Sequence, residues 1–129
     1  MKNELQKFYI CKHCGNIIGM IESSGVTPVC CNDTMTELVP NTTDASQEKH
    51  VPVIKVDGNK VTIDIGSAPH PMTEEHHISW VYIMTENGGQ RKNLDHIGTP
   101  SVSFMLTDDD KLVSAFAYCN LHGLWKADA

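Results

Sequence analysis

Cysteine and histidine residues suited to binding metal ions fall into two groups along this 129-residue chain. Four of the five cysteines lie near its beginning, Cys11 and Cys14 in "CKHCG" and Cys30 and Cys31 in "VCCN". The fifth, Cys119, stands near the end in "YCNLHG". A Cys-x-x-His segment supplies only two donors, which is too few to hold an ion alone. The uneven placement of the cysteines therefore predicts two separate metal sites.

The first group has the spacing of a four-thiolate site. A Cys-x-x-Cys pair lets two thiolates converge on one ion from a tight turn, and a second pair supplies the other corners of a tetrahedron. Neighbouring residues normally point apart, so Cys30 and Cys31 can both bind only where the backbone bends. Disulfides are the disfavoured alternative, because clustered cysteines in a reducing compartment are more often metal ligands. The sequence barely separates iron from zinc at such a site.

Histidines offer the donors that could complete the second site. Four of the seven lie in expected loops or at strand ends, where a β scaffold can aim side chains at one point. These are His50, His70, His76 and His122. Prolines on both sides of His70 restrict its backbone and lower the entropy cost of holding it as a ligand.

The elements that position these groups are predicted to be β-strands in two modules. Residues 1–37 are too few to bury a stable core without a bound metal ion, and residues 38–47 are interpreted as a polar linker. Over residues 48–129 the apolar positions alternate with period two, with turn signals at "DGN", "NGG" and "DDD". This pattern is typical of an all-β sandwich or barrel. No amphipathic helix is expected, with at most one helical turn in "MTEEHHI".

Charge and hydropathy exclude several functional classes. Lys and Arg total 10 against 16 Asp and Glu, giving a net charge of -6, and no basic run offers a surface for phosphates. The polar beginning lacks the apolar core of a secretory signal, and no stretch approaches the ~20 apolar residues that cross a bilayer. We expect a soluble, cytoplasmic protein that binds neither nucleic acid nor membrane.

These motifs together resemble the desulfoferrodoxins, the two-iron form of superoxide reductase, over essentially the whole chain. The four early cysteines match the desulforedoxin-type site, while "EKHVP", "HPM", "EEHHI" and "CNLHG" match the catalytic iron site. The resemblance implies a small desulforedoxin-like Fe(Cys)4 module followed by an immunoglobulin-like antiparallel β-sandwich with an Fe(His)4Cys site. Carried over by motif, the catalytic iron ligands are His50, His70, His76, His122 and Cys119. The same alignment sets aside His77, while His13 and His96 match no ligand motif and are interpreted as surface residues.

The resemblance also implies a reaction and partners. Superoxide is reduced by one electron to hydrogen peroxide without dioxygen production, and a rubredoxin-like donor then re-reduces the iron. Lys49 lies next to the expected ligand His50, and its positive charge is expected to attract superoxide. The resemblance implies that Glu48 can occupy the sixth iron position in the oxidised state. The protein is expected to be a homodimer.

The donor set separates this hypothesis from its alternatives. Four imidazoles and a thiolate exceed the four donors of a closed zinc site and do not fit blue copper. A non-catalytic iron electron carrier remains a second interpretation, and a zinc-stabilised interaction module a third.

Overall fold

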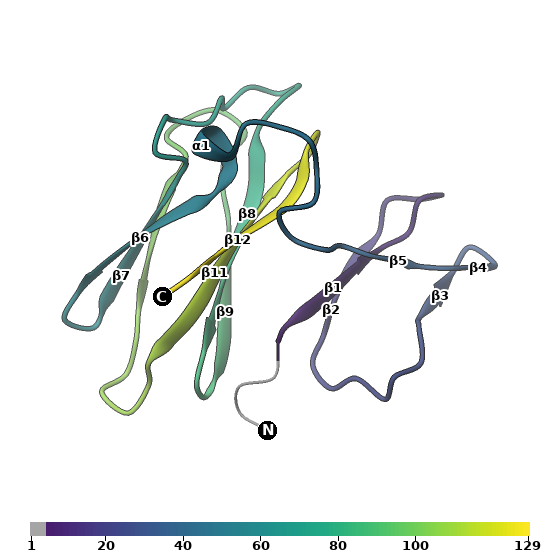
Figure 1. The fold of residues 1–129 in the computed structure, drawn as a ribbon, viewed down its shortest axis with the longest axis horizontal. Helices are drawn as coiled ribbons and strands as arrows, with labels where there is room; N and C mark the ends of the chain where they lie inside the picture. The colour runs from purple at the N-terminus through teal and green to yellow at the C-terminus, as the bar shows by residue number, and fades with distance from the viewer. Residues whose placement is uncertain (1–4) are drawn as a thin grey trace. The chain divides into compact units, whose positions relative to one another are not determined.

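The computed structural model describes residues 5–129, which divide into two compact units, 5–39 and 40–129 (Figure 1). Residues 1–4 of the predicted first module lie outside the described residues. The boundary between the units falls within the predicted linker, and the part of that segment after Val39 belongs to the second unit. There the side chain of Asn41 donates to the carbonyl oxygen of Lys126 at 3.1 Å.

The unit of residues 5–39 is a small β-structure with a minimal core. Its three-stranded antiparallel sheet has the order β2-β1-β5, and a two-stranded hairpin pairs β3 with β4. The strands are β1 (Lys7–Ile10), β2 (Ile17–Met20), β3 (Val29–Cys30), β4 (Asp33–Thr34) and β5 (Thr36–Glu37). Its buried cluster consists of Tyr9, Cys11 and Met35. So few apolar side chains leave the unit dependent on the cysteine site for stability.

The unit of residues 40–129 contains two antiparallel sheets, a three-stranded sheet β10-β7-β6 and a four-stranded sheet β12-β11-β8-β9 (Figure 1). The strands are β6 (Pro52–Asp57), β7 (Lys60–Ile65), β8 (Ile78–Thr85), β9 (Gly88–Asn93), β10 (Ser101–Met105), β11 (Leu112–Cys119) and β12 (Gly123–Asp128). Buried residues of both sheets join in one core, including Ile63, Phe104, Val81 and Ala117. The prediction of a mainly β fold with a β-sandwich is confirmed.

Period-two alternation accounts for this packing. In β7 the side chains of Val61, Ile63 and Ile65 are buried, while the residues between them are partly exposed. Successive strand residues point to opposite faces, so one face of each sheet can be apolar.

Among residues 5–129, helical structure is confined to a single turn, α1 (Gln47–His50), directly before β6. The segment "MTEEHHI" contains bends instead of a helical turn. The physical reason lies in Thr73, whose hydroxyl accepts from the His76 N–H at 3.1 Å and whose own N–H donates to the His76 carbonyl. This local bonding competes with a helical pattern. No helix in the described part of the chain is long and apolar enough to span a membrane.

Strand pairing brings several chain segments to one end of the two sheets. Pro52 at the start of β6 pairs with Ile65 at the end of β7. Cys119 at the end of β11 pairs with Ile78 at the start of β8 and with Gly123 at the start of β12. The predicted catalytic ligands lie within or next to these same segments.

Candidate metal centres

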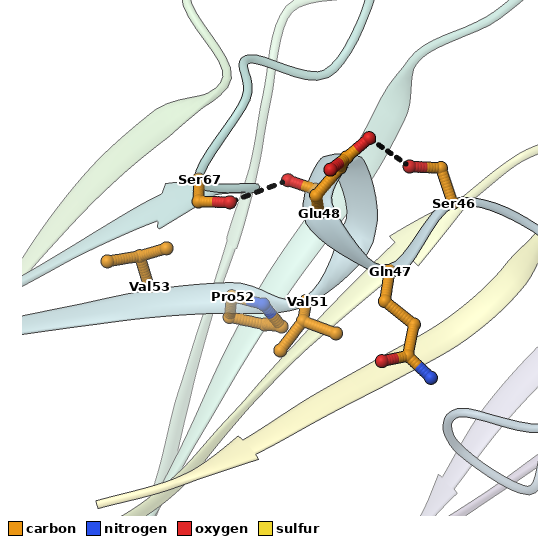
Figure 2. A pocket seen from close by; sticks show the side chains of 7 residues that line it. All are labelled: Ser46, Gln47, Glu48, Val51, Pro52, Val53 and Ser67. Carbon is orange, nitrogen blue, oxygen red and sulfur yellow. Dashed lines mark hydrogen bonds between the residues drawn. The ribbon is translucent and has the colours of Figure 1, made fainter.

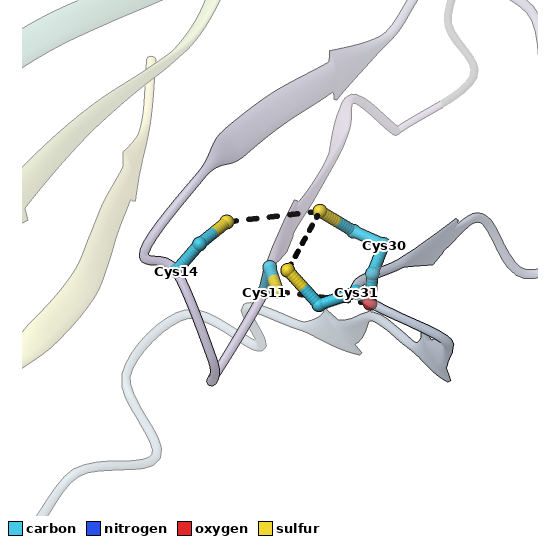
Figure 3. Close-up of side chains that lie close together, drawn as sticks. All are labelled: Cys11, Cys14, Cys30 and Cys31. Carbon is cyan, nitrogen blue, oxygen red and sulfur yellow. Dashed lines mark hydrogen bonds between the residues drawn. The ribbon is translucent and has the colours of Figure 1, made fainter.

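The four early cysteines converge on one point in the first unit (Figure 3). Their sulfur atoms all lie within 4.8 Å of one another. The Sγ atoms of Cys14 and Cys30 are 3.7 Å apart, and those of Cys30 and Cys31 are 4.0 Å apart. All five cysteines of the chain are described and all are free, so the disulfide alternative is not realised.

Two backbone bends make this convergence possible. Cys31 and Asn32 have φ angles of 53° and 60°, in the left-handed region, so the chain turns sharply after Cys30. At the other pair, the Gly15 N–H donates to the Cys11 carbonyl at 2.8 Å, closing a tight turn around the Cys-x-x-Cys segment. The bend at Cys31 and Asn32 allows the thiols of the two adjacent cysteines to face one ion.

The thiols of this cluster cannot all ionise without a cation. The pKa of Cys11 is lowered to about 6, mainly by a hydrogen bond from the backbone N–H of Cys14. Hydrogen bonds with the thiols of Cys14, Cys11 and Cys30 raise the pKa of Cys31 to about 12. The thiols therefore differ in how readily they ionise, and a bound metal ion is needed to hold four thiolates together. The donor set fits a four-thiolate metal site.

Four imidazoles form a closed circle in the second unit, the histidine ring. Neighbouring centroids are 4.7 Å apart for His50 and His70, 4.7 Å for His70 and His76, 5.1 Å for His76 and His122, and 4.9 Å for His122 and His50. Each neighbouring pair is edge-on, with interplanar angles between 75° and 83°. The diagonal from His50 to His76 is longer, at 6.4 Å. The four imidazoles therefore surround a common point.

The ligand atoms of the ring face that point together with one sulfur. His50 Nε2 lies 3.2 Å from His70 Nε2 and 3.1 Å from His122 Nδ1. Ligand atoms of His50, His76, His122 and Cys119 lie within 4.8 Å of one another, and Cys119 Sγ is 3.9 Å from His122 Nδ1. Four nitrogens and one sulfur are thus gathered at a single site.

Hydrogen bonds outside the ring leave ligand nitrogens unprotonated. His50 Nδ1 donates to the Ser46 carbonyl at 2.6 Å, and His70 Nδ1 donates to the Pro71 carbonyl at 2.7 Å. In a neutral imidazole the other nitrogen then carries a lone pair. His76 Nε2 is buried without a hydrogen-bond partner among the described residues. Lone pairs held this close to one another are stabilised by a cation, so the residues present fit a metal ion.

Burial keeps the histidines in the metal-binding form. Desolvation lowers the pKa of His50 and His76, and lowers that of His70 to about 4, so these rings are neutral at pH 7. Desolvation raises the pKa of the Cys119 thiol, which hydrogen bonds with the backbone of Leu121 and His122 partly oppose. A bound cation favours the thiolate at such a cysteine.

The remaining histidines lie elsewhere. His77 stacks on His96 with centroids 3.7 Å apart and an interplanar angle of 10°, and its Nδ1 donates to the Thr73 carbonyl. His13 Nε2 lies 3.1 Å from an Asp33 carboxylate oxygen. The geometry therefore favours His76 over His77 as the ligand, and it brings neither His13 nor His96 into the ring.

Two family models together match almost the whole chain. The family described as Desulfoferrodoxin matches residues 42–128, and the family described as Desulfoferrodoxin, N-terminal domain, matches residues 2–38. The chain belongs to the desulfoferrodoxin family. It is 41% identical to the desulfoferrodoxin homolog of Archaeoglobus fulgidus, over 96% of this chain and 98% of the relative. It is 39% identical to the desulfoferrodoxin of Nitratidesulfovibrio vulgaris, over the full length of both.

Solved structures agree with this assignment. The superoxide reductase from Treponema pallidum superposes with a TM-score of 0.83 at 38% identity, covering 97% of this chain and 100% of the other. A one-iron superoxide reductase from Giardia intestinalis matches 64% of this chain and 97% of its own, with a TM-score of 0.55 and 36% identity.

The two predicted catalytic residues of this desulfoferrodoxin family member both lie within α1. Both Glu48 and Lys49 are exposed, and the Glu48 carboxylate accepts from the Ser46 hydroxyl at 3.4 Å. The charge of Lys49 is among the smaller influences that lower the pKa of His50 and His76. Lys49 therefore lies close enough to His50 and His76 for its charge to affect them.

A pocket opens beside α1 (Figure 2). It is lined by Ser46, Gln47, Glu48, Val51, Pro52, Val53 and Ser67. The Ser67 hydroxyl donates to the Glu48 carbonyl at 3.3 Å, and the Ala68 N–H donates to the same oxygen at 2.9 Å. These bonds tie the turn that carries Glu48 to the loop after β7.

Sequence reasoning missed Trp125, which supports two of the predicted ligands. It is buried, stacks on His50 and donates its Nε1–H to the His122 carbonyl at 3.1 Å. The only sequence signal is its place in β12, three residues after His122, and a tryptophan in an apolar strand is more typical of a core residue.

Proposed function

We propose that this chain is a superoxide reductase that carries two iron centres, one at the four cysteines and a catalytic one at the histidine ring. In the overall reaction one superoxide, one electron and two protons give one hydrogen peroxide, and no dioxygen is released. The observation that carries the proposal is the convergence of four histidine nitrogens and the Cys119 sulfur on one point. The solved relatives named superoxide reductases support it.

The donor count supports redox chemistry at an open site. Five protein donors are one more than a closed tetrahedral zinc site uses, and they leave one position of an octahedral ion free. Iron bound there would supply the electron and a place for superoxide to bind. The residues that would hold this iron are His50, His70, His76, His122 and Cys119.

The charges around the ring favour a small anion. Because the buried histidines are neutral, Cys119 is the one anionic ligand, so a divalent ion retains net positive charge. Lys49, next to His50, adds a second positive charge against a net charge of -6 for the whole chain. Such a local field attracts anions and raises their rate of association.

Proposals for the partners rest on the family resemblance. A rubredoxin-like protein restores the ferrous state, and the four-cysteine iron stores or relays electrons. The protein acts as a homodimer in the cytoplasm. Glu48 would supply a further carboxylate ligand to the iron in the oxidised state.

Product stoichiometry under a steady superoxide flux tests the proposed function. With excess reductant we expect one hydrogen peroxide per superoxide consumed and no dioxygen beyond that of a metal-free control. A dismutase would release one dioxygen for every two superoxide ions, so enzyme-dependent oxygen evolution would contradict the proposal. An electron carrier would leave peroxide formation at the control level, and colourless protein with stoichiometric zinc would exclude both redox functions.

A further inference from the structure

The ladder between β8 and β11 is irregular at the end that carries Cys119. Tyr118 pairs with Trp80, but Cys119 pairs with Ile78, so Ser79 has no partner on β11. The Ser79 carbonyl accepts from the Leu94 N–H at 3.1 Å instead. A bulge of this kind adds one residue to one strand and changes the direction of the side chains beyond it. It lies three residues from the proposed ligand His76.

The next rung of this ladder is completed by a side chain. The Asn120 N–H donates to the His77 carbonyl at 3.2 Å, as a regular antiparallel pair requires. The return bond from the His77 N–H goes to Asn120 Oδ1, at 2.9 Å, where a regular pair would use the Asn120 carbonyl. The side-chain oxygen substitutes for the main-chain oxygen where the chain turns toward His122.

The other half of the same amide holds the preceding peptide. Asn120 Nδ2 donates to the Glu75 carbonyl at 2.9 Å. That carbonyl belongs to the peptide group before His76, and the His77 N–H belongs to the peptide group after it. One side-chain amide therefore bonds both peptide groups that flank His76.

His76 needs such a backbone constraint more than His50 and His70 do. His50 and His70 are each oriented by a ring N–H donated to a main-chain carbonyl. Within residues 5–129 no hydrogen bond of this kind is made by the His76 ring, and its Nε2 has no partner. The direction of this imidazole therefore depends on its backbone and on packing against the rings of His70 and His122.

We infer that Asn120 is a positioning residue that fixes His76 relative to Cys119 and His122. It is suited to this because it lies in the same turn as those two ligands while bonding the segment that carries the third. The inference rests on the proposed ligand set of the catalytic iron.

Asparagine variants of the two-iron protein test this inference. Asn120→Ala removes both amide bonds, and Asn120→Asp keeps the acceptor for His77 but loses the donor to Glu75. Asn87→Ala is the matched control, because Asn87 Nδ2 also donates to a loop carbonyl, that of Asp109, at the other end of β8. The readouts are the rate at which a chelator removes ferrous iron from the histidine site and the sulfur-to-iron absorption band of the oxidised site.

The relative iron-release rates of the three variants distinguish a positioning role of Asn120 from a general effect on stability. Loss of groups that orient metal ligands typically weakens metal binding about 10- to 100-fold, so Asn120→Ala should release iron at least about tenfold faster and shift the band. Asn120→Asp should be intermediate. The control should match the wild type, and the bands of the four-cysteine site should be unchanged in all three variants.

Several results would overturn the role of Asn120. A wild-type release rate and band in Asn120→Ala, or equal changes in Asn87→Ala, would do so. If Asn120→Ala fails to fold, the same comparison between Asn120→Asp and the control decides. A wild-type protein that holds no iron at the histidines would instead overturn the proposed function, and this inference with it.

Discussion

The indole of Trp125 stacks on the imidazole of His50, with ring centroids 4.8 Å apart and an interplanar angle of 26°. The same indole donates its Nε1–H to the carbonyl of His122. Trp125 is only 1% exposed, so its position is fixed by the core. One core side chain thus supports two neighbouring members of the histidine ring, one by its face and one by its edge.

Replacing Trp125 in two ways should separate these contacts. Trp125→Phe keeps an aromatic face for His50 but loses the N–H to His122, whereas Trp125→Leu loses both. Large-to-small changes of buried aromatic residues cost about 3–5 kcal/mol, and Trp125→Leu should approach that range because the cavity is only partly filled. Urea unfolding and iron content per chain measure the two effects. Equal iron retention in the two variants would refute a role for the aromatic face.

The charge of Lys49 should control how fast superoxide reaches the ferrous site. Lys49→Ala should slow the second-order reaction and reduce its dependence on ionic strength, because one charge of the attracting field is removed. Lys60→Ala is the control, since it removes the same charge at the hairpin end of β6 and β7, away from His50. Stopped-flow mixing at several salt concentrations gives both rates and slopes.

Glu48→Ala provides the opposite comparison within the same turn. It should leave the bimolecular rate near that of the wild type and change the spectrum of the oxidised enzyme. An unchanged rate and salt dependence in Lys49→Ala would show that Glu48 and Lys49 are only solvated surface charges.

The two iron centres should respond independently to loss of a thiolate. Cys30→Ser should abolish the absorption bands of the first centre but leave superoxide reduction with a chemical reductant intact, because the ligand sets do not overlap. Cys119→Ser should preserve the first centre and abolish most of the reductase activity. Activity that falls in proportion to the first iron in Cys30→Ser would show that this centre is an obligatory relay.

A surface ion pair offers a pH-dependent contribution to stability away from both centres. Lys55 Nζ lies 2.8 Å from Asp64 Oδ2, and the Ser101 hydroxyl donates to Asp64 Oδ1 at 2.6 Å. Lys55 chiefly, and then Ser101, lowers the pKa of Asp64 below its ordinary value of 3.8. The folded state therefore binds fewer protons than the unfolded state, and the stabilisation is present above pH 4 and lost as pH falls through the folded pKa.

A double-mutant cycle measures this contribution. Lys55→Met, Asp64→Asn and the double variant should give a coupling free energy below about 1 kcal/mol at pH 7, since the pair is partly exposed. The coupling should shrink with added salt and disappear toward pH 3. A coupling that grows on acidification would contradict the assigned direction of the Asp64 pKa.

The features that the sequence predicted well depend on local patterns. The Cys11 and Cys14 spacing reflects one tight turn, and the alternation in β7 reflects which side chains face the core, so both can be read without tertiary information. The bulge at Ser79 lies three residues from His76 and forms only when β8 and β11 pair. No spacing rule contains that register shift, and only the resemblance to known motifs selected His76.

Other functional contacts left no signal of their own in the sequence. Trp125 contacts His50 across about 75 positions of the chain, and an apolar strand gives no reason to expect a tryptophan to support a ligand. The sequence allowed at most one helical turn in "MTEEHHI", but hydrogen bonds between Thr73 and His76 give bends there. A helical turn lies instead at α1, which ends at His50. Such outcomes follow from competition among contacts that only the folded chain can make.

Gly66 lies where the loop after β7 passes the turn that carries Lys49. Its φ angle is +83°, and a Cβ atom there would lie 2.7 Å from the carbonyl carbon and oxygen of Lys49 and still closer to the carbonyl oxygen of Ala68. Its own N–H donates to the Val51 carbonyl at 3.2 Å. Glycine at this position therefore allows two backbone segments to approach closely, one leading to His70 and the other to His50.

Gly66→Ala should therefore cost more than backbone strain alone. Gly58 is the matched control, since it also has a left-handed φ, +58°, but a Cβ atom there would meet nothing within 4 Å. Gly58→Ala should lose about 1–2 kcal/mol of unfolding free energy from the left-handed conformation and keep its reaction rate with superoxide. Gly66→Ala should lose more, because the Lys49 turn must move, and its superoxide reaction should slow with a weaker salt dependence. Urea unfolding and stopped-flow kinetics on the two variants decide the matter: equal losses of stability with unchanged kinetics would show that the close approach at Gly66 has no part in placing Lys49.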